Sequence, residues 1–273
     1  FISEPVSSIT HDLQPASSTM AQLILKQIDD LLATMQQSLP SASHRSTEQK
    51  DAPSTHNAND YSTLPIIVTG GAGFIGSHTV VELIHAGFTN IIILDNFVNS
   101  SIESISRVKH ITSAATPNII NYELDIAKDV QKLDEIVARH RPYACIHFAG
   151  LKAVGESIQK PLLYYQNNLV STTNLIEVLG KYDCNNIIFS SSATVYGNNP
   201  NNKVPVTEAS QVGVGLTNPY GKTKYFIEEI LTDYGAACKS ARIVILRYFN
   251  PIGAHKSGLI GEDPQGIPNN LMP

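Results

Sequence analysis

The sequence has few cysteines, no long apolar run and no excess of basic residues. Its three cysteines, Cys145, Cys184 and Cys238, lie far apart without a Cys-x-x-Cys pair, which argues against a zinc site and a disulfide framework. We therefore expect no metal, and a reducing compartment, the cytoplasm. No apolar run approaches the ~20 residues of a transmembrane helix, so we expect no membrane partner. The formal net charge of -5 offers no basic face for nucleic acid.

The first 63 residues differ in composition from the rest of the chain. They are rich in Ser, Thr, Pro, Asn, Gln and His, which is typical of a flexible extension. Apolar residues recur at helical spacing only over about 20–39, before Pro40, and predict one amphipathic helix. This helix would either dock on a partner or on the body of the protein, or pack loosely.

From Leu64 onward, short apolar runs alternate with helical patterns. Six runs are typical of buried parallel strands: 66–69, 91–95, 119–125, 144–148, 187–190 and 243–247. Helical segments are predicted between them, at 77–85, 101–114, 127–140, 161–182 and 218–237. Strands joined by helical crossovers predict an α/β fold with a doubly wound parallel sheet, a Rossmann-like nucleotide-binding domain over 64–250.

A glycine-rich loop follows the first of these strands. Its sequence, 70–76, satisfies Gly-x-Gly-x-x-Gly between a predicted strand and a predicted helix, the context in which this motif binds a pyrophosphate. The free N–H groups and partial positive charge of a helix N-terminus favour phosphate there. Asp95 ends the next strand, 19 residues after Gly76, where a carboxylate accepts hydrogen bonds from a ribose and repels a 2′-phosphate. The predicted cofactor is therefore NAD rather than NADP.

Two further segments carry hydroxyl groups and a lysine suited to proton transfer. Ser190, Ser191 and Ser192 end the fifth strand, on the edge where a doubly wound sheet binds ligands. Tyr220 and Lys224 lie four apart on a predicted helix and so share one face. An ammonium group there can lower the pKa of the tyrosine and make it a usable acid/base near neutral pH.

Six motifs follow one another along the chain: TGGAGFIGSHT (69–79), HFAGLKAVGES (147–157), SSSATVYG (190–197), YGKTK (220–224), RYFNPIGAH (247–255) and GEDPQGIPNNLMP (261–273). Together and in this order they closely resemble the UDP-glucose (UDP-galactose) 4-epimerases, which are extended short-chain dehydrogenases/reductases. The resemblance covers essentially all of residues 64–273. It is far more specific than a shared fold.

The resemblance implies a role for each matching position. Tyr220 would be the proton acceptor, Lys224 its partner, and Ser192 the residue that bonds the substrate's 4-hydroxyl. The residues implied to hold NAD are Gly70, Gly73, Phe74, Ile75, Gly76, Asp95, Asn96, Asn99, Ser100, Asp125, Ile126, Phe148, Ala149, Gly150, Lys152, Asn167, Tyr220, Lys224 and Phe249. Those implied to contact the UDP-sugar are Lys152, Ser192, Thr194, Tyr220, Asn250 and Asn270.

The implied reaction interconverts UDP-galactose and UDP-glucose, as in galactose metabolism, through a transient 4-keto sugar. The family also pairs as a homodimer, which points to the predicted helix from Pro161 to Leu179, with Leu162, Tyr165, Leu169 and Leu175 as contacts. Residues 251–273 would begin a substrate-binding domain that is truncated here. The alternatives are a non-catalytic NAD-binding domain, a dehydrogenase that releases NADH, and a 4-epimerase for a UDP-N-acetylhexosamine, a UDP-pentose or UDP-glucuronate.

Sugar-nucleotide 4,6-dehydratases share the implied fold but carry an acidic pair directly after the active-site serine or threonine. Those positions are Ala193 and Thr194 in this chain. Neither side chain can move protons at C5 and C6 of a sugar, so the resemblance argues against dehydration.

Overall fold

The computed structural model describes residues 63–264, and the predicted helix at about 20–39 and Asn270 lie outside them. The strands are β1 (Ile66–Thr69), β2 (Asn90–Asp95), β3 (Asn118–Glu123), β4 (Ala144–His147), β5 (Asn186–Ser192) and β6 (Arg242–Tyr248). The helices are α2 (Phe74–His85), α3 (Ile102–Ile111), α4 (Val130–His140), α5 (Val154–Gln159), α6 (Pro161–Lys181) and α7 (Pro219–Ala237), with short 3-10 turns η1 (Ser113–Ala115) and η2 (Ala193–Tyr196).

All six strands form one parallel sheet in the order β3-β2-β1-β4-β5-β6. This is the doubly wound order, and it confirms the fold predicted from the alternating runs. From β1 the chain adds β2 and β3 on one side of the sheet, and then β4, β5 and β6 on the other, so the direction of winding reverses between β1 and β4. Ligands bind such folds at the carboxyl ends of the strands beside that reversal, where the glycine-rich loop follows β1 and Phe148 follows β4.

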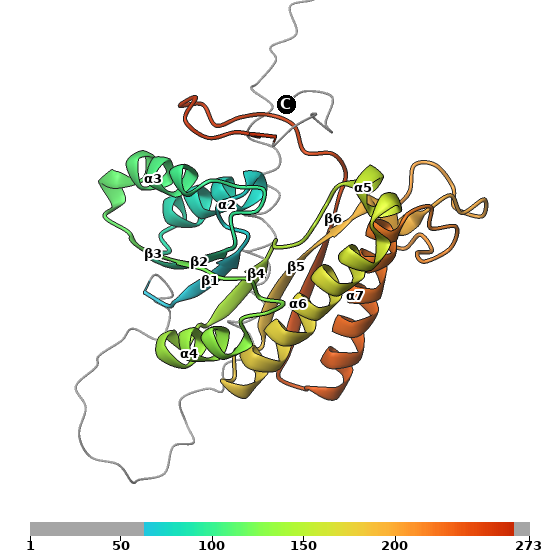
Figure 1. Cartoon of the computed structure of the whole chain (residues 1–273), viewed down its shortest axis with the longest axis horizontal. Helices are drawn as coiled ribbons and strands as arrows, with labels where there is room; N and C mark the ends of the chain where they lie inside the picture. Colours follow the sequence, from blue (N-terminus) through green and yellow to red (C-terminus); the bar gives the residue numbers. More distant parts are fainter. Residues whose placement is uncertain (1–62, 265–273) are drawn as a thin grey trace, which may run out of the picture.

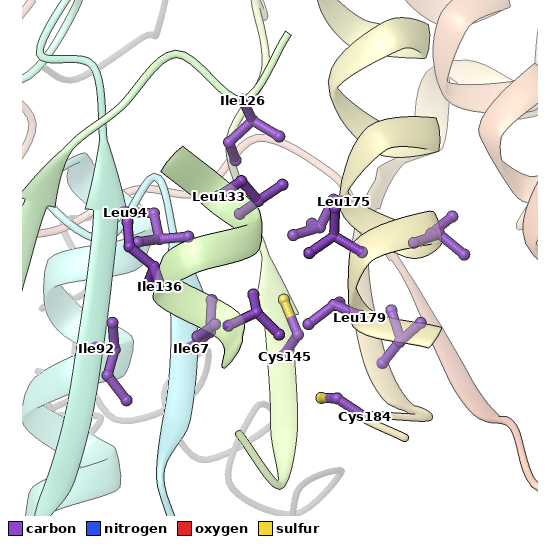
Figure 2. Close-up of a cluster of buried hydrophobic side chains, with 14 of the residues drawn as sticks. Ile67, Ile92, Leu94, Ile126, Leu133, Ile136, Cys145, Leu175, Leu179 and Cys184 are labelled. Carbon is purple, nitrogen blue, oxygen red and sulfur yellow. The ribbon is translucent and has the colours of Figure 1, made fainter. Parts of the chain in front are cut away.

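Helices cover both faces of the sheet (Figure 1). One core cluster joins α2 and α3 to the sheet through Val80, Leu83, Ile105 and Val108, none more than 2% exposed. A second joins α4, α6 and α7 to the opposite face, and Figure 2 shows its centre, with Leu133 and Leu175 meeting sheet residues such as Cys145. Because both faces are covered, the strands are continuous apolar runs rather than alternating ones.

Helix boundaries follow from local signals. Pro161 and Pro219 occupy the first positions of α6 and α7, where the missing N–H costs nothing, and the Asn218 side chain accepts the Gly221 N–H at 2.8 Å as an N-cap. Helix α5 was not among the predicted elements, since its six residues are too few to show a period. Within residues 63–264, no helix has the length and apolar character needed to cross a bilayer.

Candidate functional site

The glycine-rich loop forms a tight turn between β1 and α2. Gly70 has φ +66°, and a Cβ there would lie 2.8 Å from the Ala149 nitrogen. A Cβ on Gly76 would collide with the Gly70 carbonyl oxygen and approach Gly71 Cα to 2.7 Å, so α2 packs directly on the loop. The N-cap of α2, Gly73, makes no side-chain cap, and no acidic residue lies in the first turn. The N-terminus of α2, with Phe74 and Ile75, is therefore a fitting site for a pyrophosphate.

Asp95 ties the glycine-rich loop to the loop after β2. It is 7% exposed, accepts the Ala72 N–H at 3.0 Å through Oδ2, and accepts the Phe97 N–H at 3.0 Å and the Ser100 hydroxyl at 2.8 Å through Oδ1. A carboxylate has about four acceptor positions, so one remains for a ribose hydroxyl. Asn96 caps the following turn by accepting the Val98 N–H at 3.2 Å, and Asn99 is exposed beside it.

Asp125 and Ile126 follow β3, next to that loop. The Asp125 carboxylate accepts the Ala127 N–H at 3.1 Å and pairs with Lys128 at 2.7 Å. The Ile126 side chain is 4% exposed and packs in the α4–α6–α7 cluster, and its carbonyl accepts a hydrogen bond from Asn174. Only the backbone of Ile126 is therefore available to an adenine.

Residues 148–152 run from β4 across the carboxyl edge of the sheet. Asn168 of α6 holds this segment: its amide accepts the Leu151 N–H at 2.8 Å and donates to the Leu151 carbonyl at 3.0 Å. The same amide donates to Thr223 of α7 and accepts from Asn167, both at 3.0 Å. Asn168 thereby fixes Phe148, Ala149 and Gly150 relative to the helix that carries Tyr220.

His147 supports the same segment from within the core. It is 2% exposed, with Nδ1 at 2.7 Å from Thr69 Oγ1 and Nε2 at 3.0 Å from Thr172 Oγ1. Thr69 Oγ1 also accepts the Ala149 N–H at 3.1 Å. Burial, with a smaller contribution from the Lys224 charge, lowers the pKa of His147 to about 3, so the imidazole is neutral at pH 7.

Tyr220 and Lys224 lie one turn apart on α7, next to the end of β5. Lys224 is 5% exposed and donates to the Ser190 carbonyl at 2.6 Å, and its Nζ lies 5.8 Å from the centre of the Tyr220 ring. Ser192 accepts the Thr194 N–H at 3.2 Å and the Thr194 hydroxyl at 3.0 Å, which gives the serine a defined orientation. A Cβ on Gly221 would lie 3.3 Å from Thr194, so α7 begins directly against η2.

The pKa of Tyr220 does not show the lowering expected from an ammonium group one turn away on the same helix face. Burial raises the pKa of the Tyr220 phenol, and the hydrogen bond with Ser192 offsets part of that rise. Lys224 is itself so buried that its pKa falls to about 8, with Glu228 opposing the fall. The expectation was wrong because helical spacing says nothing about how deeply both groups are buried.

Three further predicted site residues, Lys152, Phe249 and Asn250, are exposed at the surface. Lys152 is half-exposed and pairs with Glu262 at 3.1 Å, which connects the loop after β4 to the segment after β6. Phe249 follows β6 and is 69% exposed, and Asn250 beside it is exposed too. The structure therefore does not pack Phe249 and Asn250 against the other predicted site residues.

Sequence reasoning missed four polar residues around the site: His147, Asn168 and Glu228, which are buried, and Arg247, which is partly buried. For Asn168 a signal was present, because Tyr164, Asn168, Thr172 and Leu175 share one face of α6 and a polar residue on an inward face needs partners. Within residues 63–264, no cluster of three or more His, Cys, Asp or Glu side chains is arranged to hold a metal.

A doubly wound sheet, a glycine-rich loop at its switch point and a Ser–Tyr–Lys group at the same carboxyl edge define a dinucleotide-binding domain with acid/base groups at the cofactor site. The sequence matches the NAD dependent epimerase/dehydratase family over residues 66–272, and the chain belongs to that family. The glycines fit the tight turn of such a domain, because a side chain at Gly70 or Gly76 would collide with neighbouring backbone and displace the start of α2.

Individual relatives are close in sequence. The chain is 51% identical over 218 residues to "UDP-glucose 4-epimerase" of Caenorhabditis elegans and 54% identical over 210 residues to the protein of the same name from Haemophilus influenzae, in both cases over 77% of this chain. A crystal structure of UDP-glucose 4-epimerase from Bifidobacterium longum, in complex with NAD+ and UDP, superposes with a TM-score of 0.71 at 50% identity over 76% of this chain. The chain spans about 60% of the length of these relatives.

Proposed function

We propose that this protein catalyses NAD-dependent epimerisation at C4 of a UDP-hexose and interconverts UDP-galactose and UDP-glucose. The observation that carries the proposal is the placement of Ser192, Tyr220 and Lys224 together at the carboxyl end of β5, on the edge of the sheet that also carries the glycine-rich loop, since NAD binding alone does not require that trio. Relatives that are half identical in sequence and named as UDP-glucose 4-epimerases support it.

The cofactor site is proposed to run along the carboxyl edge of the sheet. The N-terminus of α2, from Gly73 to Gly76, would hold the pyrophosphate, and Asp95 with Asn96, Asn99 and Ser100 would surround the adenosine ribose. Asp125 and the Ile126 backbone would flank the adenine. Phe148, Ala149, Gly150, Lys152 and Asn167 would line the middle of the cofactor, and Lys224 with Phe249 would lie at the nicotinamide end. Bound NAD supplies a hydride acceptor for C4 and a positive charge that favours a phenolate.

The chain's own residues would handle the proton. Tyr220 as phenolate takes the proton of the 4-hydroxyl, while Ser192 orients that hydroxyl and stabilises the phenolate through the hydrogen bond that lowers its pKa. Lys224, charged below a pKa of about 8, adds a positive charge on the same helix face. The resulting 4-keto sugar would be reduced on its other face, and Tyr220 would return the proton. Lys152, Thr194, Asn250 and Asn270 are proposed sugar-nucleotide contacts.

Among the reactions of this family, dehydration is disfavoured for this chain because the two positions after Ser192 carry no acidic side chain. Ala193 and Thr194 form the start of η2, and the Thr194 hydroxyl is engaged with Ser192. Removing a proton at C5 and protonating a leaving hydroxyl at C6 both need an acid/base group that these two residues lack.

Substrate class is tested by proton NMR of the purified chain with NAD and UDP-galactose, UDP-xylose, UDP-N-acetylglucosamine or UDP-glucuronate in separate tubes. We expect UDP-galactose to convert to UDP-glucose without NADH appearing in the filtrate. A 4-keto-6-deoxy product would identify a dehydratase, and free NADH a dehydrogenase. Faster conversion of UDP-xylose, UDP-N-acetylglucosamine or UDP-glucuronate would reassign the substrate.

We also propose a homodimer formed through α6 and α7. These helices lie side by side (Figure 1) and expose Leu162 (71%), Leu163 (42%), Val170 (40%) and Phe226 (41%), with the Tyr165 and Phe226 rings 6.4 Å apart. Leu175, expected as a contact, is 1% exposed in the core and cannot be one.

The free state of all three cysteines supports a reducing compartment such as the cytoplasm.

A further inference from the structure

A largely buried ionic cluster adjoins the proposed active site. Glu228 is on α7, one turn after Lys224 and two turns after Tyr220, and is 3% exposed. Its carboxylate accepts hydrogen bonds from Arg247 of β6, at 2.7 Å from Nη2 and 3.1 Å from Nε, and from the Ser191 hydroxyl of β5. Nothing in the proposed chemistry uses these three residues, although burying a charge pair carries a large desolvation cost.

The cluster joins four elements at the point where Ser192 must meet Tyr220. Arg247 donates from Nη1 to the Tyr196 hydroxyl of η2 and to the Glu208 carbonyl, both at 3.3 Å, and stacks over the Tyr196 ring at 5.2 Å. Consecutive residues of β5 are therefore bonded by residues one turn apart on α7: Ser190 by Lys224, and Ser191 by Glu228. Because Ser192 is the next residue of β5, these two contacts also constrain its position relative to α7.

We propose that Glu228 and Arg247 are positioning residues that fix the register between α7 and the end of β5, and so hold Ser192 against the Tyr220 phenol with Lys224 charged beside it. This inference rests on the proposed function for the roles of Ser192, Tyr220 and Lys224. Its geometry does not depend on which sugar is converted.

The electrostatic surroundings of Lys224 give the proposal a measurable consequence. Three titratable groups lie around Lys224: His147 from β4, which is neutral at pH 7, and Tyr220 and Glu228 on its own helix. Arg247 is paired with Glu228. Glu228 is the charge that raises the pKa of Lys224 against burial. Loss of the carboxylate therefore leaves burial unopposed and releases the proton at lower pH.

The first test is an NMR titration of the chain with ¹³Cε-labelled lysine, in which the Lys224 signal is assigned by its loss in Lys224→Arg. We expect Glu228→Gln, which keeps the shape but removes the charge, to lower the proton affinity of Lys224 about tenfold. Glu229→Gln is the matched control, an exposed neighbour with the same chemical change. An unchanged Lys224 midpoint in a folded Glu228→Gln protein would overturn the proposal.

A second variant covers the case in which Glu228→Gln fails to fold because Arg247 is left unpaired. Ser191→Ala removes one hydroxyl and leaves the ion pair intact. Because the Ser192 hydrogen bond lowers the pKa of Tyr220, a looser register should raise that pKa. Phenolate absorbance at 295 nm, as the difference between each protein and its Tyr220→Phe counterpart, measures it. Ser157→Ala, an equally buried serine of α5, is the control.

The outcomes separate this inference from the proposed function. A Lys224 shift in a chain that converts no UDP-sugar would sustain the positioning role and refute the epimerase. Conversion of UDP-galactose with neither Lys224 nor Tyr220 responding to the variants would sustain the epimerase and refute the positioning role.

Discussion

Burial sets the protonation states of the side chains around Tyr220. His147, Lys224 and Tyr220 all have pKa values displaced toward the neutral form, and in each case loss of hydration is the largest cause. Neutral His147 completes a hydrogen-bonded chain that ends at the Ala149 backbone, so it positions the proposed cofactor segment without adding charge.

His147 should make folding stability depend on pH. Its pKa is about 3 in the folded chain and near 6.5 when unfolded, so between these values the unfolded state binds the extra proton and stability is lost as pH falls. From pH 7 to pH 5 the expected contribution is a loss of about 2 kcal/mol. Urea unfolding at both pH values should show this component disappear in His147→Gln. It should persist in the exposed control His85→Gln, and an identical pH dependence in the two variants would refute it.

At the scale of elements, α2 and α7 bring the site together because each has a glycine in its first turn that lets it pack closely, Gly76 on the glycine-rich loop and Gly221 on η2. Helix α2 contacts the glycine-rich loop through the backbone of Gly76, and α7 begins against η2 with Asn218 as its cap. Small changes at these two helix starts should therefore affect cofactor binding and stability more than changes along the helices.

Gly76→Ala is expected to displace α2 from the glycine-rich loop, because the added Cβ would collide with the Gly70 carbonyl. Overpacking of this kind costs about 1–3 kcal/mol of unfolding free energy. The shifted helix N-terminus should also weaken NAD binding about tenfold or more, as measured by calorimetry. Gly155→Ala in α5, where a Cβ meets nothing within 4 Å, is the control and should leave NAD affinity unchanged.

Asn218→Ala should destabilise the chain by about 1 kcal/mol, since the Gly221 N–H loses its side-chain acceptor at the start of α7. Asn218→Asp keeps an acceptor there and should restore most of that loss. Chemical denaturation of the three proteins measures the difference. Equal stability of the Ala and Asp variants would show that the cap contributes nothing.

The sequence was sufficient to predict all six strands, because buried parallel strands are apolar throughout and the loops between them carry glycine or polar residues. The glycine-rich loop and Asp95 could be predicted too, because each directly follows or ends one of these strands at the spacing of a dinucleotide-binding motif. The pKa of Tyr220, the core position of Leu175 and the cluster of Glu228 with Arg247 did not follow. Each depends on which residues far apart in the chain become neighbours, and one sequence does not record that.

Over the described residues, α6 and α7 expose apolar side chains, and the dimer proposal assigns this surface to the contact with a second copy. Phe226→Glu places a charge within the proposed contact, next to Tyr165, and should shift a dimer to monomer in analytical ultracentrifugation at micromolar concentration. Val204→Glu is the control, at an exposed site (91%) in the loop after η2. A wild-type chain that sediments as a monomer would refute the dimer proposal.

The central claim is that Tyr220 moves the proton in a C4 epimerisation. The most direct test is the rate at which the purified chain with NAD converts UDP-galactose to UDP-glucose, beside Tyr220→Phe and the control Tyr225→Phe on the same helix. We predict conversion by the wild-type chain, a fall of about 10²–10⁴-fold in Tyr220→Phe and little change in Tyr225→Phe. A Tyr220→Phe protein as fast as wild type would contradict the claim, as would a wild-type chain that binds NAD and converts nothing.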